Sequence, residues 1–234
     1  MELDHFNPST NLLVEGLIRS RDPSSPGSSV GRVATAEEIV AFLDADPPPG
    51  ADPWLPGCAP ATGIDVAEPD PAWPQRFVEL AARIRAALGD RALRIDHVGS
   101  TSVPGLAAKP IIDIDLELAD TEDEASFVPQ LESVGFRHVV REPWWYGHRC
   151  LVADAPKGNL HVYPLDCPEA VRHRLFRDWL RSNDDDRALY AATKLQAAVA
   201  ANAAGEHVMD YNARKQSVIR EIYDRAFRAA GLLD

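Results

Sequence analysis

The sequence has few cysteines, and their number and spacing argue against two classes of protein. It holds three in 234 residues, Cys58, Cys150 and Cys167, with no C-x-x-C pair among them. An odd number without paired spacing argues against a disulfide framework and against a cysteine-based zinc site. We therefore expect a protein of a reducing compartment, the cytoplasm.

Long apolar runs and a surplus of positive charge are also missing. The first residues include Glu2 and Asp4, and no apolar run approaches the roughly 18 residues that span a bilayer. We expect neither export nor a membrane partner. Lys and Arg number 24 against 36 Asp and Glu, a formal net charge of -12. Because this overall field repels nucleic acid, no DNA or RNA partner is expected.

Proline is concentrated in the first part of the chain, where 12 of the 19 prolines fall within residues 1–74. This composition predicts an extended or disordered extension over residues 1–64, with short helices at 10–19 and 35–45. In the second helix, Thr35 and Glu38 have the spacing of a capping box. Such short helices need a surface to pack on, either the same chain or a second copy in a homo-oligomer.

Residues 65–234 have the periodicity of a folded α+β domain. The pattern predicts a helix at 74–88, strands at 93–98 and 111–118, and a helix at 123–134. Strands around 137–141, 146–153 and 160–165 follow, and residues 168–230 form a helical tail. The expected fold is a small mixed β-sheet with flanking helices and a helical C-terminal tail.

The strand at 111–118 alternates apolar residues with three acids, Asp113, Asp115 and Glu117. Asp113 and Asp115 lie on the same face with α-carbons about 6.5 Å apart, so their carboxylates are able to converge on one cation. The strand contains no Lys or Arg to offset the repulsion. Mg²⁺ bridged to a nucleoside triphosphate fits such a pair, and the alternative is a solvated edge strand with an acidic face.

The turn before this strand has small residues, Gly99, Ser100 and Thr101, that let a backbone fold closely around an anion. Lys109 adds a positive charge just before the acidic strand. Together they indicate a phosphate site. Taken alone, the turn is also compatible with an ordinary loop, and Lys109 with an exposed side chain.

The segment 97–114, HVGSTSVPGLAAKPIIDI, resembles the characteristic motif of the GrpB family, an uncharacterised branch of the nucleotidyltransferase superfamily related in fold to DNA polymerase beta. The resemblance extends over about residues 65–230. It implies a mixed sheet of the nucleotidyltransferase type, with Gly99 and Ser100 holding the triphosphate and Asp113 and Asp115 holding Mg²⁺. It also implies transfer of a nucleoside monophosphate to an acceptor, with pyrophosphate leaving.

One departure from that pattern affects the mechanism. Active members of the superfamily usually place a third carboxylate on a later strand, where this sequence has His161, with Asp166 as the nearest acid. His161 is a candidate general base, a sign that a second metal is missing, or a structural histidine. Arg149 and Lys194 are further candidates for gripping phosphate. Secondary candidates are His97, Arg141, His148 and Lys215.

Three functional hypotheses follow. The first is a Mg²⁺-dependent nucleotidyltransferase that acts on a small-molecule acceptor, with Asp113, Asp115, His161 and Lys109 as its catalytic residues. The second is a nucleotide-binding or sensing module of the same fold without chemistry. The third is an interaction protein that works through residues 1–64.

Overall fold

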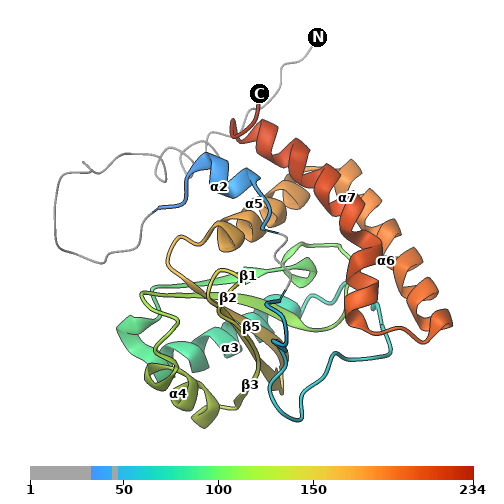
Figure 1. Cartoon of the computed structure of the whole chain (residues 1–234). Helices are drawn as coiled ribbons and strands as arrows, with labels where there is room; N and C mark the ends of the chain where they lie inside the picture. Colours follow the sequence, from blue (N-terminus) through green and yellow to red (C-terminus); the bar gives the residue numbers. More distant parts are fainter. Residues whose placement is uncertain (1–32, 44–46) are drawn as a thin grey trace.

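A computed structural model describes residues 33–43 and 47–234, in which five strands form one mixed sheet (Figure 1). The strands are β1 (Arg94–Val98), β2 (Ile112–Leu118), β3 (Phe136–Glu142), β4 (His148–Asp154) and β5 (Lys157–Pro164). Their order in the sheet is β1-β2-β5-β4-β3. This arrangement confirms the expected α+β class and the mixed sheet.

The acidic strand β2 lies inside the sheet. It pairs antiparallel with β1 and parallel with β5, so that Asp113 lies opposite Asn159 and Asp115 lies opposite His161. β4 pairs antiparallel with both β5 and β3. The alternative interpretation of β2 as a solvated edge strand is therefore wrong.

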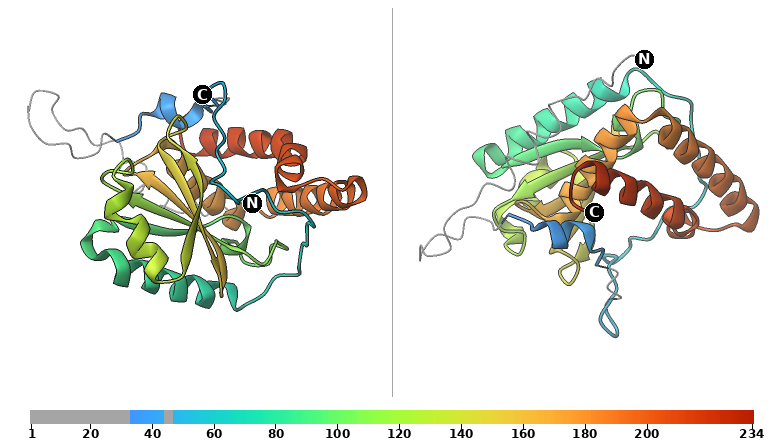
Figure 2. Two further views of the ribbon diagram at one scale, coloured as in Figure 1. Left: turned by 60° about the horizontal axis from the view of Figure 1, so that its bottom comes forward. Right: turned by 90° about the horizontal axis from the view of Figure 1, so that it is seen from above.

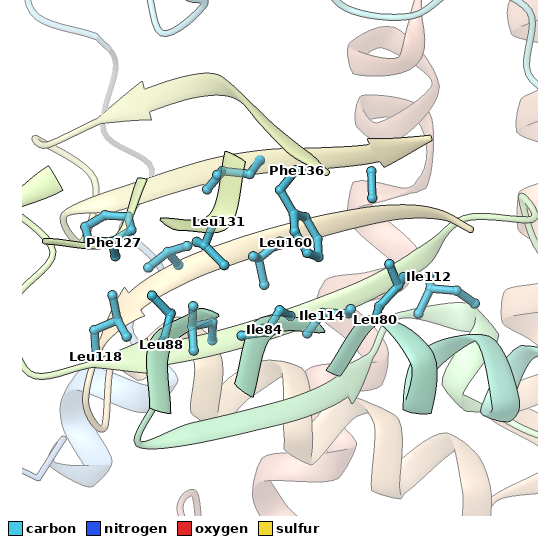
Figure 3. Close-up of a cluster of buried hydrophobic side chains, with 14 of the residues drawn as sticks. Leu80, Ile84, Leu88, Ile112, Ile114, Leu118, Phe127, Leu131, Phe136 and Leu160 are labelled. Atoms are coloured by element: carbon cyan, nitrogen blue, oxygen red, sulfur yellow. The ribbon is translucent and has the colours of Figure 1, made fainter. Parts of the chain in front are cut away.

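One face of the sheet is covered by α3 (Trp73–Leu88) and α4 (Val128–Ser133), and this layer contains the main hydrophobic core (Figure 3). The stripe Leu80, Ile84 and Leu88 of α3 packs on the apolar side chains of β2, including Ile112 and Ile114. The alternation along β2 thus sends its apolar residues to one side and its acids to the other.

The opposite, polar face is covered by α5 (Pro168–Ser182) (Figure 1). Two longer helices follow, α6 (Asp184–Ala204) and α7 (Val208–Ala229), which fold back on each other as a hairpin beside the sheet (Figure 2). Gly205 ends α6 in the left-handed conformation, which glycine adopts without steric strain. The connections contain three short 3-10 turns, η1 (Gly89–Arg91), η2 (Ser100–Ser102) and η3 (Glu124–Ser126).

The described part of the predicted extension packs on this domain. Helix α2 (Ala36–Val40) begins with the Thr35–Glu38 capping box, as predicted, and the ring of Phe42 packs against the stacked rings of Tyr223 and Phe227. The buried Arg172 of α5 donates hydrogen bonds to the carbonyl oxygens of residues 38, 39 and 41. The helix predicted at 10–19 lies outside the described residues, and the division of the chain at residue 64 stays a prediction.

Further along, residues 53–67 follow the surface as a strap. Trp54 bridges to Val140 at the free edge of β3, and Ala67 and Ala108 exchange two backbone hydrogen bonds of 2.9 and 3.0 Å. The second contact fixes the chain immediately before Lys109. Within residues 33–43 and 47–234, no helix combines the length and the apolar character needed to cross a bilayer.

We predict that Arg172→Met detaches α2 and lowers the free energy of unfolding by about 2–3 kcal/mol, because three carbonyl oxygens lose a charged donor. Chemical denaturation measures the stability, and amide exchange over residues 36–42 reports the detachment. The control Arg228→Met removes an exposed ion pair with Asp224 and should leave both readings nearly unchanged. Unaltered exchange in the Arg172 variant would contradict the anchoring role.

Candidate functional site

The three acids on the polar face of β2 have different surroundings, and Glu117 is neutralised within the protein. Its side chain is fully buried, and it accepts hydrogen bonds from Arg94, Arg174 and the backbone amide of Asp166. The Asp166 carboxylate itself pairs with Arg94. Both acids therefore belong to a structural ion cluster at the far end of β2 from the Gly99 turn.

Asp115 is also neutralised by a side chain from α5. It is 1% exposed, and its carboxylate lies 2.9 Å from Nδ1 of His173, whose Nε2 lies 3.3 Å from Glu169. Burial alone would lower the pKa of His173, but the charges and hydrogen bonds of Asp115 and Glu169 raise it well above its usual value. His173 is thus a cation held between two carboxylates.

Asp113 is the acid that keeps a free oxygen. Its Oδ1 accepts a hydrogen bond of 2.9 Å from Nδ2 of Asn159, whereas Oδ2 makes no hydrogen bond within the part of the chain that the structure describes. Gly99 packs directly against this carboxylate. A Cβ at position 99 would lie 2.4 Å from Oδ2 of Asp113, and Gly99 has a φ of 64°. Glycine is therefore required here for both space and backbone conformation.

The turn after Gly99 is held by its own side chains. The Thr101 hydroxyl donates to the Ile111 carbonyl and lies 3.0 Å from Nε2 of His97, and the His97 ring stacks on Phe77. Thr101 is buried, so the structure does not present it to a ligand, contrary to the expectation for a nucleotide-binding residue. Ser100 is half-buried and lies close enough to Tyr190 of α6 to affect the pKa of its hydroxyl group, which burial raises.

Three lysines lie beside this turn. The sequence contains only four lysines. Lys109 precedes β2, Lys194 is on α6, and Lys215 is on α7; Lys194 and Lys215 are only 2% and 7% exposed. The Lys109 and Lys215 ammonium groups lie 5.7 and 4.0 Å from the centre of the same Tyr211 ring. Lys194 donates to the Ala107 carbonyl and lies 4.7 Å from the Tyr190 ring.

The charges of these lysines affect one another. Burial and the neighbouring charge of Lys215 lower the pKa of Lys194 to about 7, although Asp113 acts in the opposite direction. Burial and Lys109 likewise lower the pKa of Lys215 to about 7, and burial lowers that of Lys109. Asp113 is the acid whose charge acts on all three. We use the name lysine pocket for the group formed by Lys109, Lys194, Lys215 and Asp113. Because one carboxylate is not sufficient for three ammonium groups, this group is suited to an anion.

The donor set fits one Mg²⁺ ion that arrives with a phosphate ligand. Mg²⁺ commonly binds one or two carboxylates together with phosphate oxygens and water, and Asp113 Oδ2 offers one such ligand. Over residues 33–43 and 47–234, no cluster of three or more His, Cys, Asp or Glu side chains is arranged to hold a metal by itself. The role of Asp115 as a second metal ligand stays a prediction, one that requires His173 to move.

The structure brings together some of the predicted residues and separates others. Gly99, Ser100, Lys109, Asp113 and Lys194 gather at one end of β2. His161 lies beside Asp115 on the same face, with Nδ1 bonded to His148.

Arg149 does not join this group. Arg149 and Leu151 are two residues apart in β4, so their side chains point to the same face of the sheet. Leu151 belongs to the main core, and Arg149 therefore projects to the core face, away from Asp113. There it donates to Glu124 and to the carbonyl of Gly147. Its predicted phosphate contact is therefore not supported by the structure. Arg141 pairs with the same Glu124.

Two residues of the site are underrated or missed by sequence reasoning. Lys215 ranks only among the secondary candidates, and His173 is not identified. The composition contains a signal that could identify Lys215. Of the 24 basic residues 20 are arginines, and three of the four lysines lie in the lysine pocket. No local pattern marks His173, since its partner Asp115 lies 58 residues away.

We predict that Gly99→Ala weakens anion binding and destabilises the protein more than Gly105→Ala does. Both positions have positive φ, so each variant pays a backbone strain of about 1–2 kcal/mol. A Cβ at Gly105 meets nothing within 4 Å, whereas at Gly99 it displaces Asp113. Denaturation and calorimetric titration with ATP measure the two effects. Equal losses in both variants would show that the close approach to Asp113 is unimportant.

Comparisons with known proteins agree with the resemblance seen in the sequence. A UPF0157 protein of Halalkalibacterium halodurans is 46% identical over 163 residues, covering 70% of this chain and 82% of that protein. A dephospho-CoA kinase of Mycolicibacterium paratuberculosis is 32% identical over 192 residues; the match covers 70% of this chain but only 46% of the kinase.

A solved structure and a family model also match. The crystal structure of the conserved protein GrpB from Enterococcus faecalis superposes with a TM-score of 0.61 at 31% identity, covering 70% of this chain and 98% of that one. The family model described as GrpB protein matches residues 63–225. The chain therefore belongs to the GrpB family.

Proposed function

We propose that this protein binds a nucleoside triphosphate at the lysine pocket and transfers its nucleoside monophosphate to a small-molecule hydroxyl acceptor. The observation that carries the proposal is the convergence of Lys109, Lys194 and Lys215 on a single acid, Asp113, beside the Gly99–Ser100 turn. A phosphate chain supplies the negative charge that the buried ammonium groups lack.

Each residue has a definable task in this reaction. The three lysines bind phosphate oxygens and stabilise the pyrophosphate as it leaves. Asp113 would hold Mg²⁺ together with the phosphates, and the ion would supply further neutralisation of the phosphate charge. The acceptor oxygen bonds to the α-phosphorus, the bond to the β-phosphate breaks, and the hydroxyl proton passes to a base. His161, beside Asp115, is the candidate for that base.

The related proteins support a nucleotide-linked role in general but not a particular reaction. Dephospho-CoA kinases from three mycobacterial species share this unit at 32% identity, within proteins named for phosphoryl transfer. Since the match covers less than half of each kinase, the name describes a longer protein. The family relation supports a nucleotide-linked role, and the lysine pocket supplies the chemistry for it.

A second candidate is a nucleotide-binding module that senses its ligand without chemistry. The observation that favours it is the engagement of Asp115 by His173 and of Glu117 by arginines, which leaves Asp113 as the one acid of β2 with a free oxygen. Such a site binds phosphate but lacks the usual carboxylates for two metal ions.

We predict that Lys194→Met and Lys215→Met each weaken ATP binding at least about tenfold, because each removes a cation from the pocket while keeping an apolar chain of similar length. The fourth lysine provides a matched control, since Lys157 is exposed at the start of β5. Calorimetry should give the same affinity for Lys157→Met as for the wild type. Equal losses in all three variants would point to a general charge effect and contradict the pocket.

Transfer of label from α-labelled nucleotides separates the two functions. A transferase releases pyrophosphate and labels a hydroxyl acceptor, whereas the sensing module binds the nucleotide and releases no pyrophosphate.

We predict that Asp113→Asn abolishes the increase in ATP affinity that Mg²⁺ gives, while the affinity for ATP measured in EDTA is retained. If Mg²⁺ has no effect on the wild type, the metal assignment is wrong.

We also predict that triphosphate affinity falls above pH 7. Lys194 and Lys215 have pKa values of about 7 in the free protein, so binding at higher pH requires that they take up protons. Between pH 7 and pH 9 the affinity should fall by about tenfold per unit for each lysine that is reprotonated. Calorimetry with tripolyphosphate in EDTA measures this slope, and a flat profile would contradict a role for these lysines.

A further inference from the structure

Three side chains form a hydrogen-bonded chain across the polar face of the sheet, outside the lysine pocket. Glu142 ends β3, and its Oε2 lies 2.7 Å from Nδ1 of His148 at the start of β4. Nε2 of His148 lies 3.1 Å from Nδ1 of His161 on β5. His148 is buried, and its ring stacks on Tyr163 and meets Trp145 edge-on. Packing therefore fixes the central ring of the chain.

The partners determine where the ring protons lie. A carboxylate at neutral pH only accepts hydrogen bonds, so His148 donates from Nδ1 to Glu142. Burial lowers the pKa of His148, and burial together with the neighbouring His148 lowers that of His161 to about 4. Because both rings are neutral near pH 7, Nε2 of His148 has a lone pair and accepts from Nδ1–H of His161. Nε2 of His161 is left without a proton.

This nitrogen differs from the others in the cluster. Both ring nitrogens of His148 are engaged, and those of His173 face Asp115 and Glu169. Nε2 of His161 makes no hydrogen bond among the residues at 33–43 and 47–234, and the residue is not fully buried. His161 lies opposite Asp115 in the β2–β5 pairing, on the face that carries Asp113. A hydrogen-bond acceptor is thus available beside the acid strand.

We infer that Glu142 and His148 are positioning residues that hold His161 in its Nδ1–H tautomer, so that Nε2 accepts a hydrogen bond from the hydroxyl group of the acceptor molecule. The hydrogen bond from the acceptor hydroxyl rests on the proposed function, whereas the assignment of the His161 tautomer does not. A nitrogen without a proton selects donors such as hydroxyl groups over carboxylates. It also orients the hydroxyl oxygen, whose lone pairs remain free to attack the nucleotide.

Nitrogen-15 NMR of the histidine rings tests the tautomer directly. In the wild type at pH 7, His161 should show a protonated Nδ1 and an unprotonated Nε2. A protonated Nε2 would overturn the inference without any variant. Glu142→Leu removes the acceptor for His148 and should shift both rings to their Nε2–H forms. The exposed Glu132 of α4 provides the control, and Glu132→Leu should leave the His161 signals unchanged. A His161 tautomer that persists in Glu142→Leu overturns the positioning role.

Turnover tests the hydroxyl role with glycerol as the acceptor and α-labelled ATP as the donor. Glu142→Leu should lower kcat by about tenfold or more, while the KM for ATP stays unchanged because Glu142 is outside the lysine pocket. An equal kcat in wild type and variant overturns the role for the hydroxyl. Absence of turnover in the wild type overturns that role together with the transferase proposal. Failure of the proposed function is distinguishable from failure of the tautomer assignment, because the NMR experiment uses no nucleotide.

Discussion

The site is organised by the electrostatic problem of burying three ammonium groups beside one carboxylate. Lys194 and Lys215 are almost completely enclosed, and the charges of the three lysines oppose one another. Protein interiors usually solve this problem with a matching acid, but here Asp113 is the one acid that acts on all three. The pKa values of Lys194 and Lys215 are accordingly lowered to about 7, and in the proposed complex an anion would supply the missing negative charge.

The acid strand shows the opposite situation at its other end. Glu117 and Asp115 are buried as well, and helix α5 delivers the cations that satisfy them, Arg174 and His173. The acids on the polar face of β2 therefore differ along the strand in how far the protein itself neutralises them. The far end of β2 is a closed structural cluster, whereas at its near end, beside Gly99, Oδ2 of Asp113 makes no hydrogen bond within the described residues. The far end of the strand contributes to stability, and the near end is the part to which the proposed function assigns binding.

Much of the fold was predictable because local patterns determine it. Alternation along 111–118 separated the core face from the acid face, and the Thr35–Glu38 spacing marked the start of α2. The turn at Gly99 was recognisable because small residues precede a run of alternating acids. The grouping of Lys109 with Lys215 was not recognisable from the sequence. Lys109 lies in the segment before β2 and Lys215 lies on α7, and the two meet only through tertiary packing.

Two of the predicted binding residues are placed elsewhere by the structure, for specific reasons. Arg149 is a predicted phosphate ligand, but β5 separates its strand from β2, and the alternation of side chains along β4 sends it to the core face, where it pairs with Glu124. Thr101 has the composition of a phosphate loop, yet its hydroxyl closes the turn internally. Sequence patterns therefore pointed to one end of one strand as the candidate site, whereas the packing of α5, α6 and α7 determines which side chains lie there.

The most direct test of the central claim is a crystal structure of the protein with a non-hydrolysable nucleoside triphosphate. The account predicts phosphate oxygens within hydrogen-bond distance of the Lys194 and Lys215 ammonium groups, next to Asp113 and the Gly99 turn. Phosphates bound on the other face of the sheet, or a lysine pocket left closed by its own side chains in the complex, would contradict it.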